Sequence, residues 1–122
     1  MLSIKSQTAL EQMRAWVRVF PEVVENEIAP GLVCFSMMKG VAVADSYVNP
    51  WCKEARGITF SLHTGEVVSR PLHKFFNVGE REETQPDKIE WNRIVRIMDK
   101  RDGSMLHPCI VDGKIQMKSK KV

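Results

Sequence analysis

The sequence predicts an α+β domain, with one N-terminal helix and a mostly antiparallel β-sheet. Apolar residues recur at helical spacing near the start, strand-like apolar runs follow from Gly31 onward, and turn signals containing glycine separate those runs. With 122 residues, of which 43% are hydrophobic, the chain is long enough for one domain with a modest core. We therefore expect residues 1–122 to form a single domain.

The N-terminal segment carries the helical pattern. Its apolar residues at helical spacing are Leu10, Met13, Val17 and Phe20. Charged and polar residues lie between them, which is typical of an amphipathic helix. The pattern predicts a helix from about residue 5 to 19 that Pro21 stops, with Thr8 or Ser6 as the cap of its first turn.

Strand-like segments follow the turn signal Pro30-Gly31. The predicted strands are residues 31–38 and 41–46, a hairpin of 56–62 and 67–72, residues 93–98, and a second hairpin of 105–111 and 114–120. Asn49-Pro50 is expected to break the chain, and Pro71 to end its strand or place it at an edge. Asp112-Gly113 predicts the turn of the last hairpin, and the charged residues 81–88 predict a surface loop.

Charge and cysteine content narrow the possible classes of function. The net charge of +3 permits phosphate binding without arguing for it. Cys34, Cys52 and Cys109 form no C-x-x-C pair, so we expect buried thiols rather than a disulfide framework or a zinc site. The N-terminus lacks the apolar core of a signal peptide, and no apolar run is long enough to span a bilayer. We expect a cytoplasmic protein without a membrane partner.

Four local motifs occur in order along the second half of the chain. They are K-E-A-R-G-I-T-F at 53–60, S-R-P-L-H-K-F-F-N-V-G-E at 69–80, D-K-R-D-G-S-M at 99–105 and Q-M-K-S-K at 116–120. Each one alone has a purely structural interpretation. Asp-Gly is a strong hairpin signal, a lysine beside two phenylalanines is typical of core aromatics next to a solvated charge, and a run of lysines is usually a solvated tail.

Taken together, the four motifs resemble the N-terminal part of bacteriophage T4 RNA ligase 1 and its relatives, the ATP-dependent RNA ligases. That family has an E-x-R-G strand followed by a hairpin, then R-P-x-x-K-F-F-N, the nucleophile motif K-x-D-G-S and a K-S-K strand. The resemblance runs from about Glu54 to Lys120. DNA ligases and mRNA-capping guanylyltransferases share K-x-D-G, but the R-P-x-x-K-F-F-N block argues against both.

The resemblance implies an incomplete nucleotidyltransferase (adenylation) fold and a lysine nucleophile. Lys100 would attack the α-phosphate of ATP and form a lysyl-adenylate for joining 5′-phosphate and 3′-hydroxyl RNA ends, as in RNA repair, with Mg²⁺ as cofactor. Because free lysine has a pKa near ~10.4, a nucleophilic lysine needs desolvation or nearby positive charge. Gly103 would let the backbone approach the nucleotide closely, and Asp102 carries over as part of the motif.

The resemblance also implies a set of nucleotide-binding residues. Besides Asp102 and Gly103, these are the cations Arg56, Lys74, Lys118 and Lys120, and the aromatic Phe76. The cations would offset the negative charge of the triphosphate, and Arg56 can make a bidentate phosphate contact. Phe76 would pack at the nucleotide site. No metal ligand is assigned.

Complete ligases of this kind carry further motifs downstream of K-S-K, and we find none of them by residue 122. We therefore expect the 122-residue chain to be the N-terminal portion of an adenylation domain that does not seal RNA alone. Its expected partners are ATP, RNA ends, and a C-terminal ligase half or a second copy of itself. The alternative is a non-catalytic remnant that binds nucleotide or RNA. If the chain is phage-encoded, it would act in the cytoplasm of the host cell.

Overall fold

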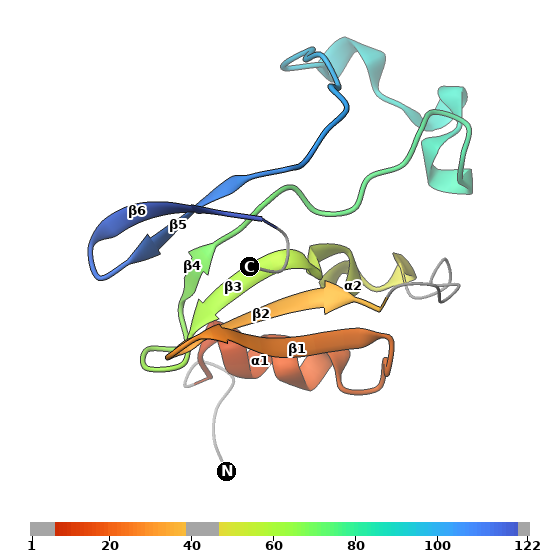
Figure 1. The fold of residues 1–122 in the computed structure, drawn as a ribbon. Helices are drawn as coiled ribbons and strands as arrows, with labels where there is room; N and C mark the ends of the chain where they lie inside the picture. Colours follow the sequence, from red (N-terminus) through yellow and green to blue (C-terminus); the bar gives the residue numbers. More distant parts are fainter. Residues whose placement is uncertain (1–6, 39–46, 120–122) are drawn as a thin grey trace. The chain divides into compact units, whose positions relative to one another are not determined.

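A computed structural model describes residues 7–38 and 47–119 (Figure 1). They fall into two compact units. Unit 1 comprises Met1–Lys74 with Met105–Val122, and unit 2 comprises Phe75–Ser104. The described chain contains helices and antiparallel strands, which confirms the predicted α+β class.

The N-terminal helix α1 spans Ala9–Val17, which is shorter than the sequence pattern predicted. Thr8 is its N-cap, and its hydroxyl Oγ1 accepts a hydrogen bond from the backbone N–H of Glu11 at 3.2 Å. Because a cap residue has non-helical geometry, the helix begins directly after Thr8. The buried residues of α1 are Leu10, Met13 and Val17, as the helical spacing predicted.

An antiparallel sheet forms the centre of unit 1 (Figure 1). Its strands are, in spatial order, β1 Val23–Ala29, β2 Leu32–Met37, β3 Arg56–Ser61 and β4 Val67–Ser69. The Pro30-Gly31 turn joins β1 to β2, with Gly31 at φ +80°. β1 was missed in the sequence because its middle residues, Glu25 to Glu27, are polar. They are tolerated there because β1 is an edge strand and these side chains are exposed.

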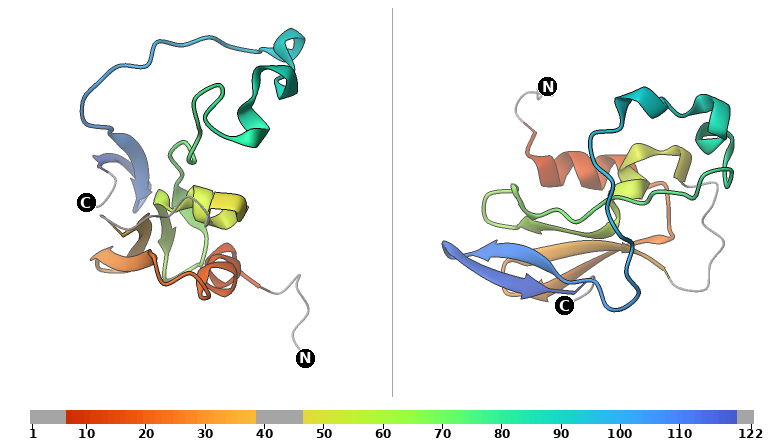
Figure 2. Two further views of the ribbon diagram at one scale, coloured as in Figure 1. Left: turned by 90° about the vertical axis from the view of Figure 1, so that its right-hand side faces the viewer. Right: turned by 90° about the horizontal axis from the view of Figure 1, so that it is seen from above.

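The two faces of this sheet are covered by different elements. Phe35 and Phe60 lie on the α1 face, where their rings meet edge to face at 5.6 Å. Cys34, the neighbour of Phe35, points to the opposite face because strand side chains alternate. There it contacts Lys118 of the C-terminal hairpin. Within unit 1, α1 and this hairpin therefore lie on opposite sides of the sheet (Figure 2).

A short helix, α2 Pro50–Glu54, lies where the sequence was expected only to break. Asn49 caps it, with its Oδ1 accepting a hydrogen bond from the Trp51 N–H at 2.8 Å, and Pro50 occupies the first turn. Asn and Pro interrupt a strand, but they also favour a helix start. Trp51 stacks on Trp16 of α1 with ring centres 6.4 Å apart, which joins the two helices.

The C-terminal hairpin consists of β5 His107–Val111 and β6 Lys114–Lys118. Asp112 at φ 50° and Gly113 at φ 74° form its turn, so both central residues are left-handed. That geometry is the type I′ turn that Asp-Gly favours, and the predicted hairpin is confirmed. The earlier hairpin of β3 and β4 is confirmed as well, with Gly65 at φ +72° in its turn.

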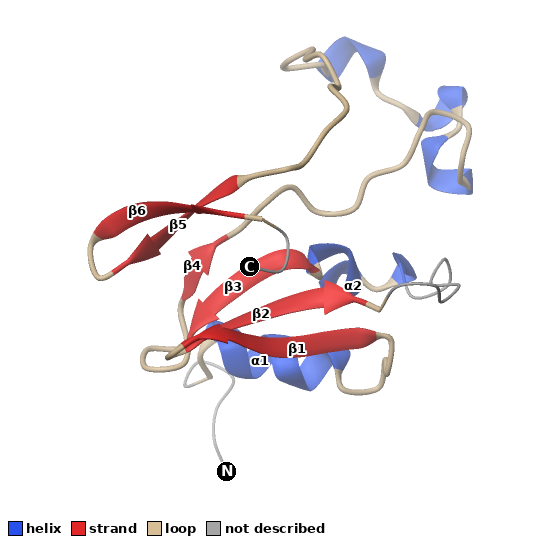
Figure 3. Cartoon of the chain, in the orientation of Figure 1, coloured by secondary structure: helices blue, strands red, loops and turns tan. Residues whose placement is uncertain are grey.

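Unit 2 contains three single turns of 3₁₀ helix and otherwise irregular chain (Figure 3). The turns are η3 Glu82–Thr84, η4 Pro86–Lys88 and η5 Trp91–Arg93. The prediction of a half-buried strand at 93–98 is wrong, because residues 94–98 form no strand and are all exposed. A strand needs a hydrogen-bonded neighbour, and no described segment pairs with these residues. The strand predicted at 41–46 lies outside the described residues.

Two further findings bear on the class of protein. Cys34, Cys52 and Cys109 are buried thiols, as expected. In the part of the chain that the structure describes, none of the helices has both the length and the apolar character needed to cross a membrane.

Candidate functional site

One of the predicted phosphate-binding cations, Lys74, lies over the ring of Tyr47 in unit 1. Tyr47 is only 9% exposed. The Nζ of Lys74 lies 5.9 Å from the centre of its ring, within the range of a cation–π interaction. The backbone of Lys74 is fixed as well, since its N–H donates to the carbonyl of Lys53 at 2.8 Å. Lys74 is thus held at both its backbone and its side chain.

Arg56 also influences Tyr47, through its charge. Burial raises the pKa of Tyr47, and the positive charge of Arg56 acts against this increase. The cation thus favours the negative form of the phenol, as a nearby positive charge does for any acidic group. No motif pointed to Tyr47, because its role depends on a three-dimensional neighbourhood rather than on sequence spacing.

An ion pair joins the first two sequence motifs. Arg70 of the R-P-L-H-K-F-F-N block donates to Glu54 of the E-A-R-G block through Nε at 3.1 Å and through Nη2 at 2.5 Å. This is the bidentate geometry that favours arginine over lysine. The carboxylate of Glu54 is largely covered, with 16% of its side chain exposed. The pair ties the end of α2 to the segment after β4.

Lys118 is buried, with 6% of its surface exposed, so it is not part of a solvated tail. Its Nζ donates to the carbonyl of Ser119 at 2.7 Å and to the carbonyl of Gly57 at 3.4 Å. It also lies 3.8 Å from the Sγ of Cys34 and 3.5 Å from the Nε2 of His107. Gly57 is the residue after Arg56, so this contact brings β6 to the start of β3.

His107 links Lys118 to β4. Its Nδ1 lies 2.7 Å from the hydroxyl of Ser69, which in turn donates to the carbonyl of Pro108. Burial lowers the pKa of His107, the charge of Lys118 lowers it further, and a hydrogen bond with the Pro108 backbone opposes both effects. The neutral form of the imidazole is therefore favoured. Sequence spacing gave no signal for this network.

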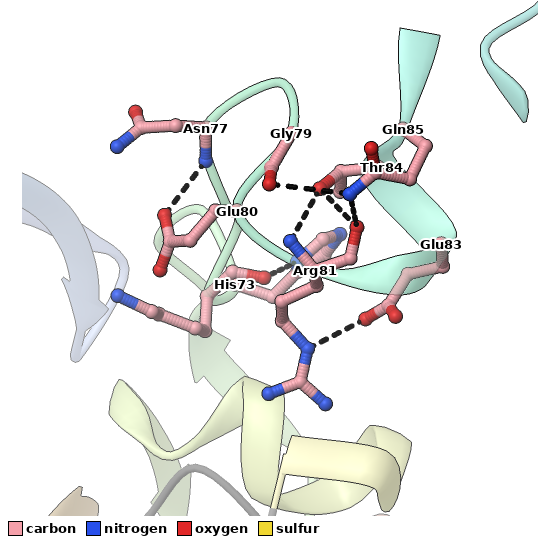
Figure 4. A network of polar contacts seen from close by, with 9 residues as sticks. His73, Asn77, Gly79, Glu80, Arg81, Glu83, Thr84 and Gln85 are labelled. Atoms are coloured by element: carbon pink, nitrogen blue, oxygen red, sulfur yellow. Dashed lines mark hydrogen bonds and ion pairs between the residues drawn. The ribbon is translucent and has the colours of Figure 1, made fainter. Parts of the chain in front are cut away.

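In unit 2, Phe76 carries a cation on its ring. The guanidinium carbon of Arg81 lies 4.5 Å from the ring centre. Arg81 is positioned by Glu83, whose Oε1 accepts a hydrogen bond from its Nε at 2.8 Å (Figure 4). Thr84 also fixes the backbone of Arg81, since its Oγ1 accepts a hydrogen bond from the Arg81 N–H at 3.0 Å. Arg81, like Tyr47 and His107, lies outside the four motifs.

The K-R-D-G-S motif also lies in unit 2. Lys100, Asp102 and Gly103 are exposed and belong to a segment without regular secondary structure. Gly103 has φ +134°, a conformation that only glycine adopts readily, and a Cβ atom there would meet no atom within 4 Å. Asp102-Gly103 does not join two paired strands, so the hairpin-turn interpretation of this motif is wrong.

The predicted site residues are thus divided between the units. In unit 1, Lys74 lies over the Tyr47 ring, the charge of Arg56 acts on Tyr47, and Lys118 lies beside Gly57. Unit 2 contains Phe76, Lys100, Asp102 and Gly103, and Lys120 lies outside the described residues. Within residues 7–38 and 47–119, there is no group of three or more His, Cys, Asp or Glu side chains that could hold a metal ion.

Comparison with known proteins decides the family. The model of the RNA ligase family, of the T4 type 1 group, matches residues 54–122, which is more than half of the chain. The chain belongs to the RNA ligase family. The match begins at Glu54 and includes all four motifs from E-A-R-G to K-S-K.

Two relatives agree with this assignment. A protein of Thermovibrio ammonificans named "Putative RNA ligase" is 45% identical over 76 residues, which cover 62% of this chain and 20% of the relative. RNA ligase 1 of Bacteriophage TS2126 is 55% identical over 31 residues, which cover 25% of this chain and 8% of the relative. The matched region thus spans a fifth or less of each of these relatives.

Proposed function

We propose that this RNA ligase family chain is the N-terminal portion of an ATP-dependent adenylation domain, in which Lys100 becomes adenylylated. The observation that carries the proposal is the K-R-D-G-S motif, whose lysine is solvent-accessible and whose glycine has φ +134°. It lies inside the stretch that matches the RNA ligase family. An accessible amine three residues before a glycine, where even a Cβ atom would meet nothing within 4 Å, leaves room for a nucleotide phosphate to approach.

The proposed step is a phosphoryl transfer to nitrogen. The lone pair of Lys100 Nζ attacks the α-phosphorus of ATP, a P–N bond forms, the bond to the bridging oxygen breaks, and pyrophosphate leaves with that electron pair. The amine loses its proton to solvent. In the later steps the AMP passes to the 5′-phosphate of one RNA end, and the 3′-hydroxyl of another end displaces it.

The cations of unit 1 would offset the negative charge of the nucleotide phosphates. Lys74 lies over the Tyr47 ring and the charge of Arg56 acts on the same tyrosine, and both cations would offset phosphate charge. Phe76, with Arg81 on its ring, offers an aromatic surface and a second charge in unit 2. Because the described residues include no metal-binding cluster, we assign Mg²⁺ no protein ligand. Magnesium would arrive with the ATP phosphates, which bind it well.

A second candidate function has one observation in its favour. Lys100 is exposed, whereas a nucleophilic lysine needs desolvation or neighbouring positive charge. In this alternative the chain binds nucleotide or RNA through Arg56, Lys74, Lys118 and Lys120 without turnover. The two candidates differ in whether AMP becomes covalently attached.

The decisive experiment is intact-protein mass spectrometry after incubation with ATP and magnesium, with GTP as the comparison nucleotide. Adenylylation predicts one added AMP that is lost in both Lys100→Ala and Lys100→Arg, since a guanidinium stays protonated and cannot attack. Lys114→Arg is the matched control, because Lys114 is an exposed lysine outside the motif's segment. An adduct that persists in both Lys100 variants would exclude Lys100 as the nucleophile. ATP binding without an adduct would favour the binding module.

A further inference from the structure

A buried lysine without an acidic partner lies under the C-terminal hairpin. Lys118 is 6% exposed, and no described carboxylate forms an ion pair with it. Burying an ammonium group is costly unless its donors are satisfied. Here the carbonyls of Ser119 and Gly57 and the Nε2 of His107 serve as acceptors. The charge therefore depends on neutral acceptors from three parts of the chain.

The hydrogen bonds around His107 have one consistent direction. The hydroxyl of Ser69 donates its proton to the carbonyl of Pro108, so its oxygen must accept from His107 Nδ1–H at 2.7 Å. With the ring proton on Nδ1, the lone pair of Nε2 faces the Nζ of Lys118 at 3.5 Å and accepts from it. This arrangement requires a neutral imidazole.

Protonation of His107 would break this arrangement at one atom. The new proton would sit on Nε2 and point at the Lys118 ammonium, replacing a donor–acceptor contact with a repulsive contact between two cations. The other titratable groups around the pair are Cys34 on β2 and Cys109 on β5, neither of which carries a compensating negative charge when it is a thiol. β4 contributes the Ser69 hydroxyl and β3 the Gly57 carbonyl.

We propose that Lys118 and His107 form a pH-sensitive latch that holds the β5–β6 hairpin on the face of the sheet opposite α1 and releases it when His107 is protonated. The latch connects β6 to β3 through Gly57 and β5 to β4 through Ser69. It would work whether or not Lys100 is adenylylated. Opening it would also release Ser119, which directly precedes Lys120 in the K-S-K motif.

The sign of the pH dependence follows from linkage. The docked state disfavours protonated His107, and the released histidine binds a proton with an ordinary pKa near ~6.5. Above the pKa of the released histidine, protonation does not oppose docking. As the pH falls below it and through the lowered pKa of docked His107, the docked state becomes less stable. One proton changes the docking equilibrium by at most about tenfold per pH unit.

The three cysteines supply a site-specific readout. Cys34 and Cys109 lie between the sheet and the hairpin, with exposures of 2% and 3%, and become accessible when the hairpin leaves. Cys52 on α2 is equally buried but makes no contact with the latch, so it reports on global unfolding. Dithiodipyridine reacts with thiols in acid as well as at neutral pH, and peptide mass spectrometry assigns each adduct. Glutathione measured in parallel normalises the reagent's own pH dependence.

We expect the labelling rates of Cys34 and Cys109 to rise below about pH 6.5, by up to about tenfold per unit, while that of Cys52 does not. His107→Gln, which keeps an acceptor and a donor but does not titrate, should abolish the rise. Lys118→Met should make it shallower by removing the facing charge. Equal labelling of all three thiols, or protection of Cys34 and Cys109 that is independent of pH, would overturn the latch. The wild-type comparison decides the outcome even if a variant fails to fold.

Discussion

The ammonium nitrogen of Lys74 lies 5.9 Å from the centre of the Tyr47 ring. Arg56 interacts electrostatically with the same tyrosine. One buried aromatic side chain thus contacts a cation of the R-P-L-H-K-F-F-N block and feels the charge of a cation of the E-A-R-G block. Tyr47 itself belongs to neither block.

The alkaline titration of Tyr47 tests this arrangement directly. Tyr47 is the only tyrosine in the chain, so phenolate absorbance reports on it alone. Burial raises its pKa above the ordinary value of 10.0. We expect Arg56→Gln to raise the pKa further, because the substitution removes the cation that favours the phenolate. The measurement is a spectrophotometric titration of both proteins.

Arg18→Gln provides the control for this titration, since Arg18 is exposed at the end of α1 and should leave the pKa unchanged. Because the folded-state pKa is raised, stability should also fall as the pH rises above the ordinary tyrosine pKa. An unchanged pKa in Arg56→Gln would show that Arg56 does not act on Tyr47.

Gly65 should be the most sensitive turn position in unit 1. It has φ +72°, and a Cβ atom added there would lie 2.5 Å from the Cβ of Thr8, the cap of α1. Its carbonyl also accepts a hydrogen bond from the Leu10 N–H at 2.9 Å. We expect Gly65→Ala to destabilise the fold by about 3 kcal/mol in urea unfolding, because backbone strain adds to a clash with a fixed residue.

Gly31→Ala is the matched control for Gly65. Gly31 has a similar φ of +80°, but no atom lies within 4 Å of the added Cβ. Only the left-handed conformation is then penalised, by about 1 kcal/mol. Equal losses in the two variants would mean that the contact with Thr8 is not rigid.

The exposed apolar segment after η5 should promote self-association. Val95 is 99% exposed and Ile97 is 86% exposed, within a stretch that has the composition of a strand. Such segments associate readily. We expect sedimentation velocity to show concentration-dependent association that is reduced in a Val95→Lys, Ile97→Lys double variant.

Val19→Lys is the comparison for this experiment, because Val19 is 70% exposed but lies outside that segment. It should leave the association unchanged. A wild-type protein that stays monomeric at every concentration would contradict the expectation.

Cys52 should be a poor nucleophile near neutral pH. Burial and the negative charge of Glu22 raise its pKa to about 11. Since only the thiolate alkylates, we expect iodoacetamide at about pH 8 to modify Cys52 at least about a hundredfold more slowly than a free cysteine. The rate should keep rising with pH up to the raised pKa. A rate that levels off near the pKa of an ordinary thiol would show that Cys52 is more accessible than its burial indicates.

Local signals in the sequence predicted much of the fold. The Asp112-Gly113 turn, the cap at Thr8 and the β3–β4 hairpin are set by neighbouring residues, so a pattern of a few positions was sufficient. β1 was missed because an edge strand tolerates polar residues. For residues 94–98 the error was the reverse, because a strand was predicted and none forms. An alternating pattern gives no strand without a partner strand.

Site residues could be proposed from the sequence only where motifs define them. Resemblance to a family pointed to Lys100 and Lys74, because their spacing lies within conspicuous blocks. Tyr47 and His107 act through neighbours that are distant in sequence, so no spacing rule could find them. Lys118 lies in a motif, but its burial could not be predicted from that motif. The burial depends on how the whole β5–β6 hairpin packs against the sheet.

The bidentate contact between Arg70 and Glu54 changes what the family signature means. These two motif residues form an ion pair with each other, so part of the family signature maintains the fold rather than the reaction. In related chains, replacement of one should be accompanied by replacement of the other, whereas Lys100 should vary with neither. A search that gives every signature position equal weight would then make two errors. It would reject active relatives in which this ion pair has been replaced by another pair. It would also retain inactive relatives that have lost only the nucleophilic lysine.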